Sequence, residues 1–80
     1  SSEAAYYLQD RTKEKISDIL EECGIKNADI RISINIENEN EMKIESVTIL
    51  AEKEYENQFK NAEENLKNQM GIETKIEVKK

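Results

Sequence analysis

The apolar residues of this chain recur at two different spacings, one typical of helices and one typical of strands. In the segment 2–23, with Thr12 bridging the gap between Leu8 and Ile16, they follow steps of three and four residues, which is the spacing of one face of an α-helix. Gly24 follows, at a position where a left-handed residue commonly ends a helix. The segment 52–70 has the same spacing and is followed by Gly71. We therefore predict helices over 2–23 and 52–70.

Strict alternation of apolar and polar residues predicts three strands. Residues 29–37 read D-I-R-I-S-I-N-I-E, with four isoleucines on one face. In 42–51 the apolar residues change parity near Glu45 and Ser46. One extra residue there, a β-bulge, would bring all of them onto one face. The third predicted strand is 72–79, which alternates again after the second helix.

The predicted order of elements is α-β-β-α-β within a single domain, 1–80. Each strand has one apolar and one polar face, which places both helices on one face of a three-stranded mixed sheet. A right-handed crossover makes the second and third strands parallel. The strand 29–37 has the most regular isoleucine run and is predicted at the centre of the sheet. The fold class is therefore α+β, a two-layer sandwich. If the strand 42–51 is regular rather than bulged, Ile44 faces solvent beside Leu50.

Composition narrows the chemistry. The 80 residues include 18 acidic and 12 basic ones, for a net charge of -6, with no His, one Cys and two Gly. The usual general base and His-ligated metal sites are thereby excluded, as are an intrachain disulfide and a glycine-rich phosphate loop. The acidic balance argues against nucleic acid as a partner. We predict a non-enzymatic protein without cofactor or metal, and a soluble fragment, because no apolar run approaches the roughly 20 residues that cross a bilayer.

Four side chains and one turn are candidates for a functional role. For each of them we favour a structural role. Cys23 lies on the apolar stripe of the first helix, which predicts a buried thiol. Tyr6 and Tyr7 lie near the start of the first helix and Tyr55 begins the second. Around Tyr6 and Tyr7 only Arg11 is basic, too little for base stacking, so packing at the helix ends is preferred. The turn 37–41 alternates Glu and Asn but lacks the glycine of a calcium loop, which favours a solvated turn and leaves weak divalent binding open.

The polar face of the predicted sheet has the best claim to function. A small domain without a pocket interacts mainly through its flat faces and strand edges. Simple solvation of this mixed-charge face is the other reading. The residues expected on it are Arg31, Ser33, Asn35, Lys43, Thr48, Leu50, Glu73, Lys75 and Glu77.

The element order, with Gly-Ile after each helix, resembles the ring-building motif of bacterial secretion-ring and sporulation-channel proteins. More closely, the chain resembles the C-terminal soluble region of the stage III sporulation protein AF family. The stretches that carry this resemblance are Tyr6-Tyr7, Ile16 to Cys23, Asp29 to Ile36, Ile44-Glu45-Ser46-Val47-Thr48-Ile49, the Glu/Lys/Asn-rich second helix, and Gly71-Ile72 to Ile76-Glu77-Val78.

The resemblance implies a structural module of the transenvelope channel complex that links mother cell and forespore. N-terminal helices outside this sequence would anchor the protein in the mother-cell membrane, with this domain in the intermembrane space. Its partners would be other proteins of the channel, or further copies of itself. No catalytic residues carry over from the family. Ring assembly would set the helices of one copy against the sheet face of the next.

Two other classes of function are considered. A nucleic-acid domain related to KH folds shares much of this element order, but it needs a Gly-x-x-Gly loop and a basic groove, and the sequence has neither. A small ligand-binding regulatory domain of the α+β type predicts a concave pocket with convergent polar groups.

Overall fold

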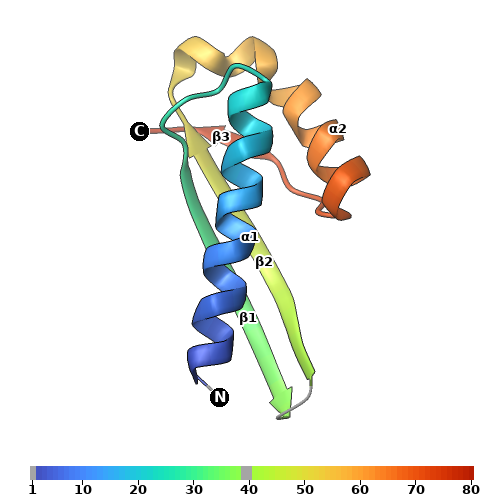
Figure 1. Cartoon of the computed structure of the whole chain (residues 1–80). Helices are drawn as coiled ribbons and strands as arrows, with labels where there is room; N and C mark the ends of the chain where they lie inside the picture. Colours follow the sequence, from blue (N-terminus) through green and yellow to red (C-terminus); the bar gives the residue numbers. More distant parts are fainter. Residues whose placement is uncertain (1, 39–40) are drawn as a thin grey trace.

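The computed structural model describes residues 2–38 and 41–80 of the chain. It has two α-helices, one 3₁₀-helix and a three-stranded mixed sheet (Figure 1). The predicted α+β class and the order helix-strand-strand-helix-strand are confirmed. In chain order the elements are α1 (Ser2–Glu22), β1 (Asp29–Asn38), β2 (Glu41–Ala51), η1 (Lys53–Gln58), α2 (Phe59–Met70) and β3 (Ile76–Val78).

Both α-helices end at the predicted glycines. Gly24 and Gly71 have φ angles of 86° and 67°, in the left-handed region that glycine enters without steric cost. The N–H of Ile25 then donates to the carbonyl of Leu20 at 2.9 Å, which satisfies one of the orphan carbonyls of the last turn. The residue after each glycine is a buried isoleucine, so each stop also anchors the following chain in the core.

The second predicted helix, 52–70, is divided into two kinds of helix. Lys53–Gln58 forms η1, and the α-helix begins only at Phe59. Glu52 precedes η1 in an extended conformation and makes no side-chain capping bond. No side chain caps the start of this segment. Its first turns have the hydrogen bonds of a 3₁₀-helix, which join residues three positions apart, such as the bond from the Phe59 N–H to the Glu56 carbonyl.

The sheet order is β1-β2-β3, so β2 occupies the centre. The prediction that β1 would be central is wrong. β2 receives β1 through an antiparallel hairpin, and the crossover through α2 returns β3 to the other side of β2. The strand shared by the two connections is therefore the middle one, whatever the isoleucine content of its neighbour. β2 and β3 are parallel, as predicted.

The predicted bulge lies in β2. Ser33 pairs with Ser46, and the next residue of β1, Ile34, pairs with Ile44. Glu45 is the extra residue between these two pairs. The bulge corrects the parity of β2, so Ile44 lies on the apolar face opposite Ile34 rather than beside Leu50 on the polar face.

β3 is much shorter than the predicted strand 72–79 and covers only Ile76–Val78. The N–H of its first residue donates to the Glu63 carboxylate of α2 at 2.8 Å. Just before it, the Thr74 hydroxyl donates to the carbonyl of Val47 in β2 at 2.9 Å. The side chains of Glu63 and Thr74 thus fix the segment between α2 and β3. The backbone hydrogen bonds between β2 and β3 begin only after this segment.

The core is one cluster to which both α-helices and all three strands contribute. This arrangement places both α-helices against the same face of the sheet. The buried apolar residues are Ile16, Ile19, Leu20, Ile25, Ile30, Ile49, Ala51, Phe59, Ala62, Leu66, Ile72 and Ile76.

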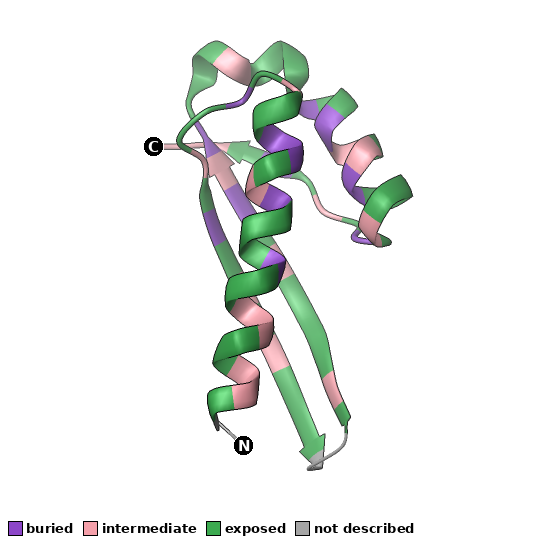
Figure 2. Ribbon diagram, in the orientation of Figure 1, coloured by how far each residue is buried: buried purple, intermediate pink, exposed green. Residues whose placement is uncertain are grey.

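The helix layer covers only part of the hairpin. Twelve residues of α2 span about 18 Å, whereas eleven residues of β2 span about 36 Å. Beyond α2, only the first half of α1 accompanies the strands, and Figure 2 shows buried positions giving way to exposed ones toward the hairpin tip. The described part of the molecule is accordingly elongated, at 41 × 25 × 17 Å.

Candidate protein-interaction surface

Seven of the nine residues expected on the polar sheet face lie there. They are brought together as cross-strand neighbours: Arg31 with Thr48, Asn35 with Lys43, Leu50 with Glu77, and Ser33 with Ser46. No helix covers this face in the described part of the chain, because both α-helices pack on the other one. Its use as a binding surface stays a prediction.

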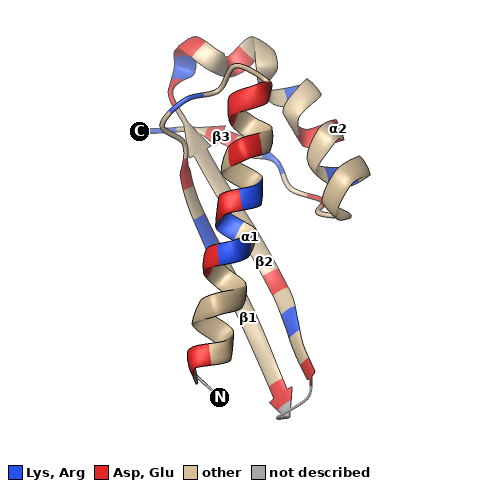
Figure 3. Ribbon diagram, viewed as in Figure 1, with Lys and Arg blue, Asp and Glu red and all other residues tan. Residues whose placement is uncertain are grey.

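Two acidic residues that were not expected on this face also belong to it. The Oδ2 of Asp29 lies 3.7 Å from a guanidinium nitrogen of Arg31. The Ser33 hydroxyl donates to the carboxylate of Glu45, the bulge residue, at 3.4 Å. The parity change that predicted the bulge could have identified Glu45 as a residue of this face. Charges of both signs therefore alternate here, as Figure 3 shows for the hairpin, and the face has no strong field of one sign.

A shallow depression interrupts the polar face where β3 joins it. Its volume is about 480 Å³, and the half-buried Leu50 is one of the residues that line it. The residues that line it are Asp29, Leu50, Glu77, Val78, Lys79 and Lys80. Lys79 is held in place there, because its Nζ donates to the carbonyl of Asn27 at 2.7 Å and lies 3.8 Å from Glu52.

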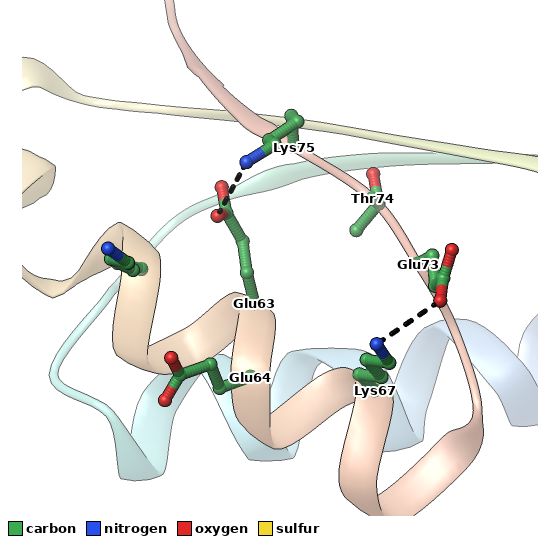
Figure 4. Close-up of a pocket in the computed structure, with 7 residues that line it drawn as sticks. Glu63, Glu64, Lys67, Glu73, Thr74 and Lys75 are labelled. Carbon is green, nitrogen blue, oxygen red and sulfur yellow. Dashed lines mark ion pairs between the residues drawn. The ribbon is translucent and has the colours of Figure 1, made fainter.

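The other two predicted residues, Glu73 and Lys75, are not on the polar sheet face. They precede the shortened β3 and turn toward α2, where Glu73 pairs with Lys67 at 3.4 Å and Lys75 with Glu63 at 4.0 Å (Figure 4). The physical reason is the shortening of β3, since the chain leaves α2 beside its last turns before it reaches the sheet. These two residues therefore belong to a different surface.

That second surface is a charged depression of about 560 Å³ between α2 and the chain entering β3. Its lining residues are Lys60, Glu63, Glu64, Lys67, Glu73, Thr74 and Lys75. Three ammonium groups and three carboxylates offset one another, so the depression does not select a cation or an anion by charge. Glu63, whose side chain is 17% exposed, is already engaged by the Ile76 N–H and by Lys75.

Cys23 is half-buried, not buried as predicted, although it packs against the core. It lies at the end of α1, where the exposed Asn61 amide donates to its sulfur at 3.7 Å. Burial, and to a lesser degree the charge of Glu22, raise the pKa of the thiol above its ordinary value. A raised pKa lowers the fraction of thiolate, which is the reverse of what a cysteine nucleophile needs.

The tyrosines differ from one another. Tyr55, within η1, packs against the core, and its burial together with the charge and hydrogen bond of Glu54 raises the pKa of its phenol. Tyr6 and Tyr7 do not pack as predicted: they are 66% and 69% exposed. Their helix extends past α2, so there is no second helix for them to contact in the described part of the chain.

Two isoleucines at the same end of the molecule are exposed as well. Ile36 of β1 is 49% exposed and Ile44 of β2 is 38% exposed, although both belong to the apolar face of the sheet. We call Tyr6, Tyr7, Ile36 and Ile44 the distal apolar surface. Large apolar side chains exposed at the same end of a small domain are available to a protein partner. Sequence periodicity could not reveal them, since it assigns a residue to a face and not to a covered length of that face.

Part of the predicted turn 37–41 lies outside the described residues, namely Glu39 and Asn40. Within residues 2–38 and 41–80, the structure places no three His, Cys, Asp or Glu side chains so that they could hold a metal ion. In the same ranges, no helix has the length and apolar character needed to span a membrane.

Comparison of the chain with protein-family models, with curated proteins and with solved structures finds no match.

Proposed function

We propose that this domain is a non-enzymatic assembly module that acts by contacting other proteins. The observation that carries the proposal is the distal apolar surface. Four large apolar side chains remain 38% to 69% exposed in a domain whose apolar core is otherwise well covered. Removing exposed aromatic and branched aliphatic groups from water stabilises a complex with a partner by about 25 cal/mol for each Å² of apolar surface buried.

Two side chains of the kinds that serve catalysis, Glu63 and Cys23, have structural roles in the fold instead. Glu63 accepts the Ile76 N–H and pairs with Lys75, which fixes the approach to β3. The raised pKa of Cys23 keeps that thiol protonated to higher pH than an ordinary cysteine. Both groups therefore support a structural role.

The more specific form of the proposal is a component of the transenvelope channel of a sporulating bacterium. Its support is the resemblance to the stage III sporulation protein AF family described above. Under this proposal an N-terminal anchor holds the parent protein in the mother-cell membrane, and the domain meets other channel proteins in the intermembrane space. The polar sheet face and the distal apolar surface are the regions proposed to make these contacts.

A genetic experiment tests this specific form. The parent gene is expected to encode two hydrophobic helices upstream of Ser2, and its deletion is expected to block development of the engulfed forespore. Complementation with a Tyr7→Ser, Ile44→Ser variant should fail, whereas the control Asn68→Ser, on the exposed side of α2, should restore spores. A parent protein without a hydrophobic segment, or normal sporulation of the deletion strain, would contradict the channel assignment.

A further inference from the structure

β1 is a ten-residue strand with an open edge. Its neighbour in the described sheet is β2 on one side, and β3 lies at the far side of β2. The segment 29–38 contains neither Pro nor Lys, the residues that most often protect such edges. A strand of this length offers a row of backbone donors and acceptors to another strand.

The hydrogen bond from Gln9 identifies which residues form that row. Its Nε2 donates to the carbonyl of Ile32 at 3.0 Å, from α1 rather than from β2. Within a strand, the N–H and C=O of one residue point to the same side, and successive residues alternate. The outward-pointing groups are therefore those of Ile30, Ile32, Ile34 and Ile36. The Ile32 carbonyl already accepts one bond from Gln9 and keeps a second lone pair for another strand.

Two exposed apolar side chains stand beside this edge. The side of α1 that faces it carries Gln9 and Lys13, which line a narrow groove of about 250 Å³ against residues 30–32. Tyr6 lies one turn earlier on the same side of α1, because the steps from 6 to 9 and from 9 to 13 are three and four residues. Tyr6 and Ile36, 66% and 49% exposed, thus lie toward the hairpin tip along the same edge.

We infer that β1 pairs edge to edge with β1 of a second copy of the chain, antiparallel, to form one continuous six-stranded sheet. The inference names a partner for the assembly module and rests on that proposed function for its biological use. A two-fold axis makes such a contact self-complementary, so each copy supplies the same edge and the same exposed side chains.

Charge favours one register of this pairing over those that oppose like charges. With the axis at Ile34, Arg31 lies opposite Glu37 of the second copy, and the symmetry repeats the pair. Moving the axis to Ser33 sets Asp29 against Glu37, and moving it to Arg31 sets two arginines together; both arrangements oppose like charges. The side chain of Arg31 is 76% exposed, and Glu37 has no partner residue in β2 because the register shifts between Ile36 and Asn38.

The favoured register also covers the exposed isoleucine. Ile36 of one copy comes opposite Ile32 of the other, which lies beneath α1, and the two copies of Ile34 meet at the axis. The same register places the two copies of Tyr6 near the axis, above this row. The open edge, the exposed apolar groups and the charge pattern therefore converge on one arrangement.

A charge-swap experiment on the chain tests the inference. Light scattering over a concentration series is expected to show a rise from 9.3 kDa to twice that mass. Arg31→Glu and Glu37→Arg should each weaken the dimer about tenfold, because two symmetric pairs turn repulsive. The double variant should restore it. The control Lys43→Glu, with the same charge change on β2, should leave it unaltered.

Amide exchange supplies a second readout at single residues. The N–H groups of Ile34 and Ile36 should exchange more slowly as concentration rises, while those of Arg31 and Ser33, directed toward β2, should not change. A mass of 9.3 kDa at all concentrations up to about 1 mM, or a dimer that the single charge reversals leave intact, would overturn the inference. A monomer would leave the assembly proposal standing, since that proposal is tested in the sporulating cell.

Discussion

At the scale of single residues, Gly71 shows how one backbone conformation ends an element. Its φ of 67° lies in the left-handed region, and its N–H donates to the carbonyls of Leu66 and Lys67. A Cβ at this position would meet no atom within 4 Å, so a side chain adds backbone strain but no clash. The cost of substitution at Gly71 therefore reflects backbone strain, offset by the smaller conformational entropy of the unfolded variant, and includes no steric clash.

Gly71→Ala is expected to lower the free energy of unfolding by about 1 kcal/mol, because alanine pays for the left-handed conformation. For a domain of this size that is a fall of about 4 to 8 °C in the melting temperature. Asn68→Ala, at an exposed position of the same helix, is the control and should leave stability unchanged or raise it slightly. Equal melting temperatures for the wild type and the Gly71 variant would contradict this account of the helix end.

Cys23 offers a test by pH. Because burial and the Glu22 charge raise the pKa of the thiol, less thiolate is present at pH 8 in the folded chain than in the unfolded one. Reaction with a disulfide reagent at pH 8 should be slower in buffer than in denaturant, and its rate should keep rising above the ordinary thiol pKa. Glu22→Gln, which removes the smaller cause, should speed the folded reaction. A folded thiol that reacts faster than the unfolded one would show that the direction of the shift is wrong.

At the scale of elements, the bulge in β2 tests how register is set. Deleting Glu45 removes the extra residue, so Ile44 and Val47 keep their places on the apolar face in a regular ladder. The fold should persist, with stability within about 1 kcal/mol of the wild type. Deleting Thr48 instead moves Val47 to the polar face and should cost at least about 3 kcal/mol. Circular dichroism during urea unfolding distinguishes the two, and equal losses would contradict the pairing described here.

Sequence periodicity predicted the elements whose signals are local. The four isoleucines of 29–37 define β1, the parity change near Glu45 and Ser46 defines the bulge, and the two glycines define the helix ends. The misses depend on tertiary contacts. β3 is short because Glu63 and Thr74 hold the chain before it, and no pattern in 72–79 records that.

At the scale of the whole molecule, the mismatch in length between α2 and the hairpin decides which surfaces are available. The Cα radius of gyration is 13.1 Å, above the roughly 12 Å expected for a compact domain of 80 residues. The excess reflects the hairpin and the start of α1 that project beyond α2 (Figure 1). The projecting end carries the distal apolar surface, Tyr6, Tyr7, Ile36 and Ile44.

The candidate site was predictable from the sequence only in part. Alternation along β1 and β2 placed Arg31, Asn35 and Lys43 correctly on the polar face, because a face follows from parity. Glu73 and Lys75 were misplaced, because their surface depends on where the chain leaves α2. The distal apolar surface required the structure, since exposure follows from the length of a neighbouring element.

The central claim is that the domain functions by binding other proteins. Light scattering of the chain mixed with the soluble domains of candidate channel proteins, each at about 0.1 mM, tests it most directly. The account predicts a complex heavier than either component, which Tyr7→Ser with Ile44→Ser weakens and Asn68→Ser does not. Components that keep their separate masses in every mixture, or a complex that the Tyr7 and Ile44 substitutions leave unchanged, would contradict it.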